Sequence, residues 1–211
     1  MDITTFFSVM ANDLNDPNED EFTKAIKIQK ISDARISLIS LIDNHYLTEI
    51  EYTELSATLT AGKVLLTAIA TGKSVIKGEE GIISVKVTSG KYCTKIDKTN
   101  PKRTQNYYYG ATLRNPLYEV KGGYVYVYPT SVLNADITFL KVPDALTVVS
   151  TTVELNDALH TILLLMAEAL CWYYVGKKDD GNNLTAIAHK EIALLNEKVR
   201  PQEHVGEKET K

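Results

Sequence analysis

Cysteine is scarce in this sequence, with Cys93 and Cys171 the only two among 211 residues. Two thiols do not make a disulfide framework or a four-ligand zinc site. Three of the four histidines, His45, His189 and His204, are scattered with no metal-ligand spacing. The sequence therefore predicts no metal and no cofactor, and the cysteine usage is typical of proteins made in a reducing cytosol.

An excess of basic residues and a long apolar run are also missing. The 23 lysines and arginines are outnumbered by 27 acidic residues, whereas a dedicated nucleic-acid binder carries a clearly basic surface. The longest apolar stretch, residues 162–175, contains Glu168 and is too short to span a bilayer. The first residues have no positive region and carry acids, which is unlike a signal peptide. We therefore expect no contact with a membrane.

One pair of residues suggests a catalytic nucleophile and base, namely Cys171 and His160. Both fall on one face of a predicted helix. At the helical rise of about 1.5 Å per residue they lie roughly 16 Å apart along the axis, so they cannot meet. Cys171 is therefore interpreted as a buried structural cysteine.

Two partial motifs fail at a required position. A calcium loop beginning at Asp180 has Thr185 where that loop needs glycine. The tripeptide Gly72-Lys73-Ser74 has Thr67 where a phosphate-binding loop needs its first glycine. With no catalytic pattern left, the sequence predicts a protein that is not an enzyme.

The N-terminal third predicts two helices. A short amphipathic helix starts at a cap supplied by Thr4 or Thr5, and Asn15-Asp16-Pro17-Asn18 ends it. A longer helix follows over roughly residues 19–45. Its apolar positions recur at spacings of three and four, which predicts one buried stripe: Ile28, Ile31, Ala34, Leu38, Leu41 and Ile42.

The period then changes to that of β-structure. Leu55, Ala57 and Leu59 alternate with polar residues, and residues 61–63 predict a turn. Residues 64–70 fit a second strand or a short helix, and both interpretations stay open. Further strands are predicted at residues 82–87 and 92–96.

The clearest local element is the sequence LYEVKGGYVYVYP, in which Gly122-Gly123 predicts a two-residue hairpin turn. The expected register buries one face, with Tyr118, Val120, Val125 and Val127. It leaves the other partly wet, with Glu119, Lys121, Tyr124 and Tyr126. A third strand over residues 136–142 is expected to extend this meander.

The C-terminal quarter returns to helix. Thr151-Thr152-Val153-Glu154 fits a capping box for a helix that runs to Val175, apolar nearly all round over its second half. A linker over residues 177–182 precedes a second helix from Asn183, and the pair is expected to form an antiparallel hairpin. The segment from Pro201 onward is polar.

These elements predict an α+β fold. A helical bundle of the N-terminal helices and the C-terminal helix hairpin takes residues 1–50 and 150–200. A small antiparallel β domain, residues 51–149, is inserted between them, and residues 201–211 form an extended C-terminal tail.

Tyrosine is over-used, with 12 residues against four phenylalanines, and tyrosine is enriched at protein interfaces. Two interpretations of Tyr124 and Tyr126 in the hairpin stay open, namely packing within the chain and contact at a subunit interface. Tyr107, Tyr108 and Tyr109 follow a stretch with Lys91, Lys95, Lys98, Lys102 and Arg103. That stretch is read either as a loop that docks on a neighbouring subunit or as a contact with DNA.

The order of elements resembles the head-to-tail adaptors, or tail-tubular proteins, of short-tailed bacteriophages. Three pieces carry the resemblance. The opening FFSVMANDLNDPNEDEFTKAIKIQKISDARISLI is similar to the family's helix, Leu-x-Asp loop and second helix. NPLYEVKGGYVYVYPTSVLNADITFLKVPDAL resembles its strands ending in Tyr-Pro and Lys-x-Pro. LHTILLLMAEALCWYYVGKKDDGNNLTAIAHKEIALL resembles its closing helix pair. Residues 46–80 do not follow the family pattern.

The resemblance implies a structural virion protein of the phage neck, assembled in the host cytoplasm. It implies a ring of commonly twelve copies that binds the portal protein and a distal tail or nozzle protein. Packaged DNA would pass through the channel without specific binding, so the basic stretch 91–103 is expected to point away from the lumen. The tail is expected to dock on the portal or a neighbouring subunit through Pro201, His204 and Val205.

Two alternatives from other classes remain. One is a virion-associated hydrolase that acts on the cell envelope, which a pair of carboxylates in a concave pocket would favour. The other is a DNA-binding accessory protein, which a contiguous basic face would favour.

Overall fold

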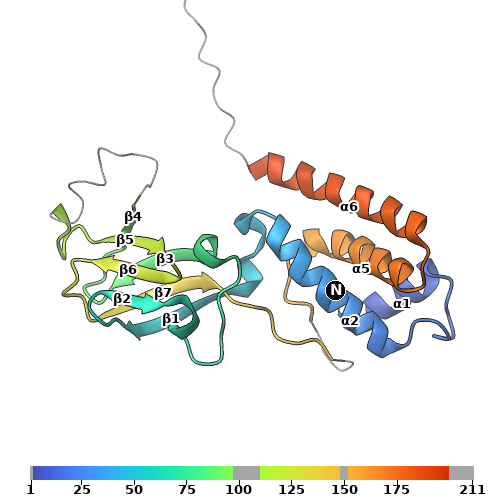
Figure 1. The fold of residues 1–211 in the computed structure, drawn as a ribbon, viewed down its shortest axis with the longest axis horizontal. Coiled ribbons are helices and arrows are strands. Elements are labelled where there is room, and N and C mark those ends of the chain that lie inside the picture. Colours follow the sequence, from blue (N-terminus) through green and yellow to red (C-terminus); the bar gives the residue numbers. More distant parts are fainter. Residues whose placement is uncertain (1, 97–109, 148–151, 200–211) are drawn as a thin grey trace, which may run out of the picture. The chain divides into compact units, whose positions relative to one another are not determined.

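The computed structural model describes residues 2–96, 110–147 and 152–199 (Figure 1). Over these residues the fold is α+β, with four α-helices and two small sheets. The chain divides into two compact units: a helical unit, Met1–Tyr46 with Leu146–Lys211, and a β unit, Leu47–Ala145. No helix within the described ranges combines the length and apolar character needed to cross a membrane.

Helix α1, Ile3–Asp13, begins two or three residues earlier than the sequence predicted. Its cap is Asp2, whose Oδ1 accepts a hydrogen bond of 2.7 Å from the backbone N–H of Thr5. The prediction of Thr4 or Thr5 as the cap was wrong, because a carboxylate at this place satisfies a free N–H group of the first turn equally well. The helix buries Ile3, Phe6, Phe7 and Met10.

The predicted start of the second helix at residue 19 was also wrong. Helix α2, Lys24–Leu41, is capped by Thr23, and residues 15–23 form an ordered loop. The buried carboxylate of Asp16 organises that loop by accepting backbone N–H bonds of 2.8 Å from both Asp20 and Phe22. Phe22 is fully buried and lies edge-on to Trp172. The predicted stripe is buried at Ile31, Ala34, Leu38 and Ile42, half-buried at Ile28 and exposed at Leu41.

Helix α5, His160–Tyr174, is the central element of the helical unit and packs against α1, α2 and α6 (Figure 1). Its apolar character explains this position, because it has to be covered on several sides. The prediction that it starts at the Thr151–Glu154 capping box was wrong. Asn156 instead caps a short 3-10 turn, Asp157–Leu159, that leads into the helix.

Helix α6, Lys178–Val199, starts well before the predicted Asn183. Gly181, taken from the sequence as part of a linker, lies inside the helix. A Cβ atom there would come within 2.7 Å of the Tyr173 ring. The glycine therefore serves the close approach of α6 to α5, and Tyr173 fixes that approach by donating a hydrogen bond to Oδ1 of Asn182 at 2.9 Å.

The β unit consists of two sheets. The first has three strands in the order β1 (Glu51–Thr58), β7 (Asn134–Leu140) and β3 (Ile82–Val87). The second has four, in the order β2 (Lys63–Leu65), β6 (Tyr124–Tyr128), β5 (Leu117–Lys121) and β4 (Thr94–Lys95). The two open interpretations of residues 64–70 are both partly right, because β2 is followed by a 3-10 turn over Leu66–Ala68.

The hairpin of β5 and β6 has the predicted register. Lys121 pairs with Tyr124, Val120 with Val125, and so on to Tyr118 with Val127. Gly122 and Gly123 both have positive φ, as a two-residue turn of this kind requires. The face expected to be buried is buried.

Two other β predictions were wrong. The strand after the hairpin, β7, does not extend the meander but becomes the centre of the other sheet, between β1 and β3. Its alternating Ala135, Ile137 and Phe139 side chains are buried and face the opposite sheet. Leu55 does not share a face with Ala57, because the pairing shifts between Glu54 and Ala57 and leaves Leu55 71% exposed.

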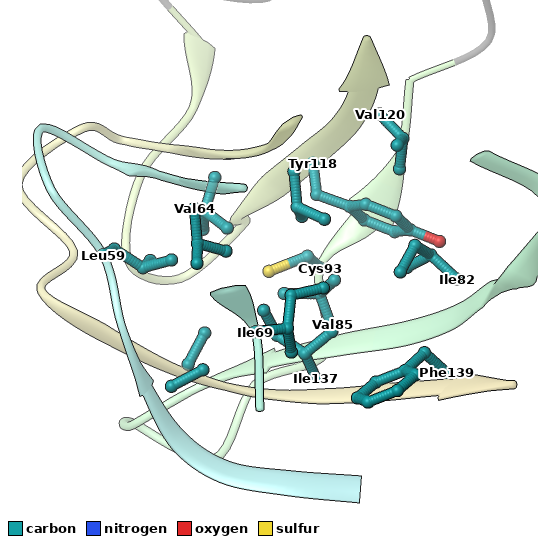
Figure 2. Close-up of a cluster of buried hydrophobic side chains, with 14 of the residues drawn as sticks. Leu59, Val64, Ile69, Ile82, Val85, Cys93, Tyr118, Val120, Ile137 and Phe139 are labelled. Carbon is teal, nitrogen blue, oxygen red and sulfur yellow. The ribbon is translucent and has the colours of Figure 1, made fainter. Parts of the chain in front are cut away.

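The core of the β unit lies between the two sheets. Figure 2 shows Val64, Tyr118 and Val120 from one sheet opposite Val85, Ile137 and Phe139 from the other, with Cys93 among them. Each sheet thereby buries its inner face against the other.

Candidate interaction surface

The outer face of the four-stranded sheet gathers tyrosines. Tyr124, Tyr126 and Tyr128 alternate with the buried Val125 and Val127 along β6, so all three side chains leave the core on the same side. Cross-strand pairing sets the rest of the face beside them. We name this surface the tyrosine face, and it comprises Tyr124, Tyr126 and Tyr128 with Lys63 and Leu65 of β2 and Leu117, Glu119 and Lys121 of β5.

A lysine holds two of the tyrosine rings. The Nζ atom of Lys63 lies 5.1 Å from the ring centre of Tyr124 and 6.0 Å from that of Tyr126. The two rings are themselves 6.0 Å apart and tilted by 49°. Cation–π contacts of this kind are favourable, so Lys63 links β2 to the two rings of β6.

The single carboxylate of the tyrosine face, on Glu119, is already hydrogen-bonded within the chain. Glu119, expected from the sequence to be partly wet, is only 9% exposed, which corrects that prediction. Its Oε1 accepts a hydrogen bond of 2.9 Å from the hydroxyl of Tyr128, because a carboxylate covered by neighbouring rings needs such a donor.

The groups that stay available are mainly donors. Within the described part of the chain, the hydroxyls of Tyr124 and Tyr126 and the ammonium of Lys121 have no hydrogen-bond or ion-pair partner. Leu65 is 42% exposed beside them and adds apolar area. Tyrosine is one of the residue types enriched at protein contact surfaces, which makes this face a candidate for one.

Sequence reasoning found part of this surface. It placed Tyr124 and Tyr126 on the wet side of the hairpin, where the structure has them. It missed Tyr128, which continues the same alternation, and it missed Lys63 and Leu65. The alternation of Lys63 and Leu65 with the buried Val64 was the available signal, but a strand of three residues carries too short a pattern.

The remaining predicted site residues lie outside the described residues. These are Tyr107, Tyr108 and Tyr109, the basic residues Lys98, Lys102 and Arg103, and Pro201, His204 and Val205 of the tail. Lys91 and Lys95, at the near end of the basic stretch, are exposed.

The cysteine and histidine of α5 have structural surroundings. Cys171 is fully buried as predicted, and this burial raises the pKa of its thiol to about 12, against the opposing charges of Lys30 and Lys27. His160 is buried against the ring of Phe6, and its Nδ1 lies 3.1 Å from a carboxylate oxygen of Asp157. A thiol with so high a pKa is not a nucleophile at neutral pH.

Two carboxyl groups do come together in the helical unit. Glu168 of α5 is 4% exposed. Burial first, and then the charge and hydrogen bond of Asp13, raise its pKa to about 8. A carboxyl group with a raised pKa beside a second carboxyl group is the pattern of a general acid. A substrate cannot reach the Glu168 side chain, however, because it is almost fully buried.

The helical unit also has a hollow of about 370 Å³ between the end of α2 and α6. It is lined by Leu41, His189, Ile192, Ala193, Asn196 and Glu197. The amide of Asn196 is engaged in joining the two helices, since it donates to the Leu41 carbonyl and accepts from the Asp43 N–H. Glu168 and Asp13 do not line this hollow. No cluster of metal-ligating side chains occurs among residues 2–96, 110–147 and 152–199.

In comparisons with known proteins, no family model matches the chain and no curated protein sequence matches it.

Proposed function

We propose that this chain is a structural virion protein, a head-to-tail adaptor that forms a ring between the portal and the tail of a short-tailed phage. The observation that carries the proposal is the tyrosine face. It gathers half-buried aromatic rings and hydrogen-bond donors on one outer surface, which fits binding to protein rather than catalysis.

The arrangement of the chain supports the same proposal. The resemblance implies a helical bundle made from both ends of the chain with a β domain inserted between them. The helical unit draws on residues from both ends, and the β unit takes the middle. In this bundle α5 would be the centre, with α1, α2 and α6 around it.

The proposed partners follow from this role. Copies of the chain would contact one another in a closed ring, commonly of twelve, with the portal protein on one side and a distal tail or nozzle protein on the other. Such a ring needs heterologous contacts, in which one surface of each copy meets a different surface of the next. Packaged DNA would pass through without specific binding, since tight phosphate contacts would hinder its movement.

The two alternatives receive less support. For a hydrolase, Glu168 is buried in the helix packing, and neither it nor the exposed Asp13 lines the hollow beside α2 and α6. For a DNA-binding protein, the tyrosine face carries two lysines, Lys63 and Lys121, whereas duplex binders commonly make about six to ten phosphate contacts.

The proposal is tested on virions and on the purified full-length chain. Mass spectrometry and labelled-antibody electron microscopy of purified virions should locate the chain at the neck, and particle images of the chain, alone and with portal rings, should show a closed ring. Absence from virions, or a chain that stays monomeric even with portal present, would overturn it.

A paired substitution tests the role of the face. Tyr124→Ser with Tyr126→Ser should weaken ring formation or portal binding while leaving the circular dichroism spectrum unchanged. Tyr92→Ser is the matched control, because Tyr92 is 69% exposed and also lies under a lysine, Lys86, but belongs to no part of the tyrosine face. Equal loss in both variants would argue against a specific contact.

A further inference from the structure

The chemistry of the tyrosine face defines what can bind it. Among the described residues, the hydroxyls of Tyr124 and Tyr126 and the ammonium of Lys121 have no hydrogen-bond or ion-pair partner, and the ammonium of Lys63 lies over the two rings without a carboxylate partner. Its one carboxylate, on Glu119, is covered and bonded to Tyr128. The face is therefore positive and rich in donors, so a complementary surface has to supply negatively charged acceptors.

The helical unit carries a segment of that kind. In the loop before α2, the carboxylates of Asp20 and Glu21 are exposed and have no ion-pair or hydrogen-bond partner among the residues that the structure describes. Their neighbour Glu19 is paired with the buried Lys27 at 3.3 Å. We name Glu19–Glu21 the acidic loop.

The acidic loop is held in one conformation before binding. Asp16 accepts hydrogen bonds from the backbone N–H groups of Asp20 and Phe22 at 2.8 Å, and the buried Phe22 ring fixes the end of the loop. A loop that is already ordered loses little conformational entropy when it docks. The backbone that carries the two free carboxylates is thus held in place before docking.

We propose that the tyrosine face of one copy binds the acidic loop of a second copy of this chain. Asp20 and Glu21 accept from Lys63, Lys121 and the tyrosine hydroxyls, while Leu65 covers the apolar edge. The two surfaces lie in different units, so the contact is heterologous and can close into a ring. This inference rests on the proposed function and names the contact by which the ring closes.

A nucleic acid is the less favoured occupant. The Tyr124 and Tyr126 rings, which could stack on bases, already have the Lys63 ammonium over them. Two lysines on a chain of net charge −4 also give little attraction for a phosphate backbone.

Charge reversal and its rescue test the proposal. The variant K63E/K121E and the variant D20K/E21K should each self-associate on the order of a hundredfold more weakly than the wild type, because like charges then face each other. The fourfold variant K63E/K121E/D20K/E21K restores opposite charges and should recover most of the association. Sedimentation velocity over a concentration series measures all of them, and K86E is the control on the other sheet.

Each result decides between the alternatives. If K63E/K121E assembles as the wild type does, the face is not the contact and the proposal fails while the ring itself stands. If both double variants fail and the fourfold variant fails too while keeping its thermal melt, the acidic loop is not the occupant. Unchanged assembly with weaker binding to a DNA duplex would instead assign the face to nucleic acid. A wild-type chain that forms no ring, alone or on the portal, overturns the proposed function itself.

Discussion

The ammonium of Lys27 lies 3.3 Å from the carboxylate of Glu19, and the Lys27 side chain is fully buried while that of Glu19 is 29% exposed. This pair joins α2 to the loop that precedes it. A buried charge is costly unless it is paired. Loss of the pair therefore costs more free energy at the buried ammonium of Lys27 than at the partly exposed carboxylate of Glu19.

That inequality gives a prediction. Glu19→Gln should lower the free energy of unfolding by about 1–3 kcal/mol, because it leaves a buried ammonium without its counter-charge. Lys27→Met should cost less, about 1 kcal/mol or under, since the released glutamate can turn to water. Urea denaturation followed by circular dichroism measures both, with Glu21→Gln as an exposed control. Equal losses for Glu19→Gln and Lys27→Met would show that the pair is not held as described.

Asp16 is predicted to make the loop sensitive to acid. Burial of its carboxyl works against ionisation, but hydrogen bonds from the backbone N–H groups of Phe22, Asp20 and Glu21 outweigh it and hold the pKa below its ordinary value. A depressed pKa contributes stability that is present above the ordinary value and is lost as pH falls through the depressed one.

Amide hydrogen exchange measures this effect. The N–H groups of Asp20 and Phe22 should lose protection on acidification. Asp16→Asn keeps only one of the two acceptor oxygens, so it should lower the protection at neutral pH as well. Asp20→Asn, which keeps the backbone bond, is the control. Protection of Phe22 that is unchanged in Asp16→Asn would contradict this account.

The sequence predicted what depends on neighbouring residues. The hairpin and its register followed from Gly122-Gly123, because two residues with positive φ fix both the turn and the pairing that grows from it. The burial of α5 followed from its composition. Alternation likewise placed Tyr124 and Tyr126 on the outer side of β6.

The sequence did not predict the features that depend on contacts between residues far apart in the chain. The alternation of apolar residues in β7 identifies which side of the strand is buried, whichever sheet the strand joins. It does not identify β1 and β3 as the partner strands, because these lie far away in the chain. Gly181 looked like a linker residue because only the ring of Tyr173, on another helix, gives the reason for a glycine. The tyrosine face was half found for the same reason, since β2 joins β6 across a long stretch of sequence.

Alanine substitutions at two glycines with nearly equal φ can distinguish the cost of backbone strain from the cost of steric crowding. Gly62 has φ +73°, and a Cβ atom there would lie 2.8 Å from both Thr130 Cα and the Val127 carbonyl oxygen, whereas Gly72 has φ +72° and open space. Gly72→Ala should therefore cost about 1 kcal/mol from strain alone. Gly62→Ala should cost clearly more, about 3 kcal/mol, because backbone atoms have to move. Thermal denaturation compares the two, and equal costs would mean that the turn at Gly62 relaxes freely.

Glu168 gives a prediction for alkaline pH. Burial and the neighbouring Asp13 raise its pKa from an ordinary value of 4.5 to about 8. Between these two values the folded chain keeps a proton that the unfolded chain has released, so the free energy of unfolding falls as pH rises, by roughly 1.4 kcal/mol per pH unit, and levels off above about 8. Glu168→Gln cannot ionise and should show a flatter profile, with its advantage over the wild type growing toward the upper end of the window. Urea denaturation at several pH values measures both curves, and Glu191→Gln, exposed on α6, should follow the wild type. Parallel curves for the wild type and Glu168→Gln would show that Glu168 is ionised in the folded chain, with its charge satisfied by another group.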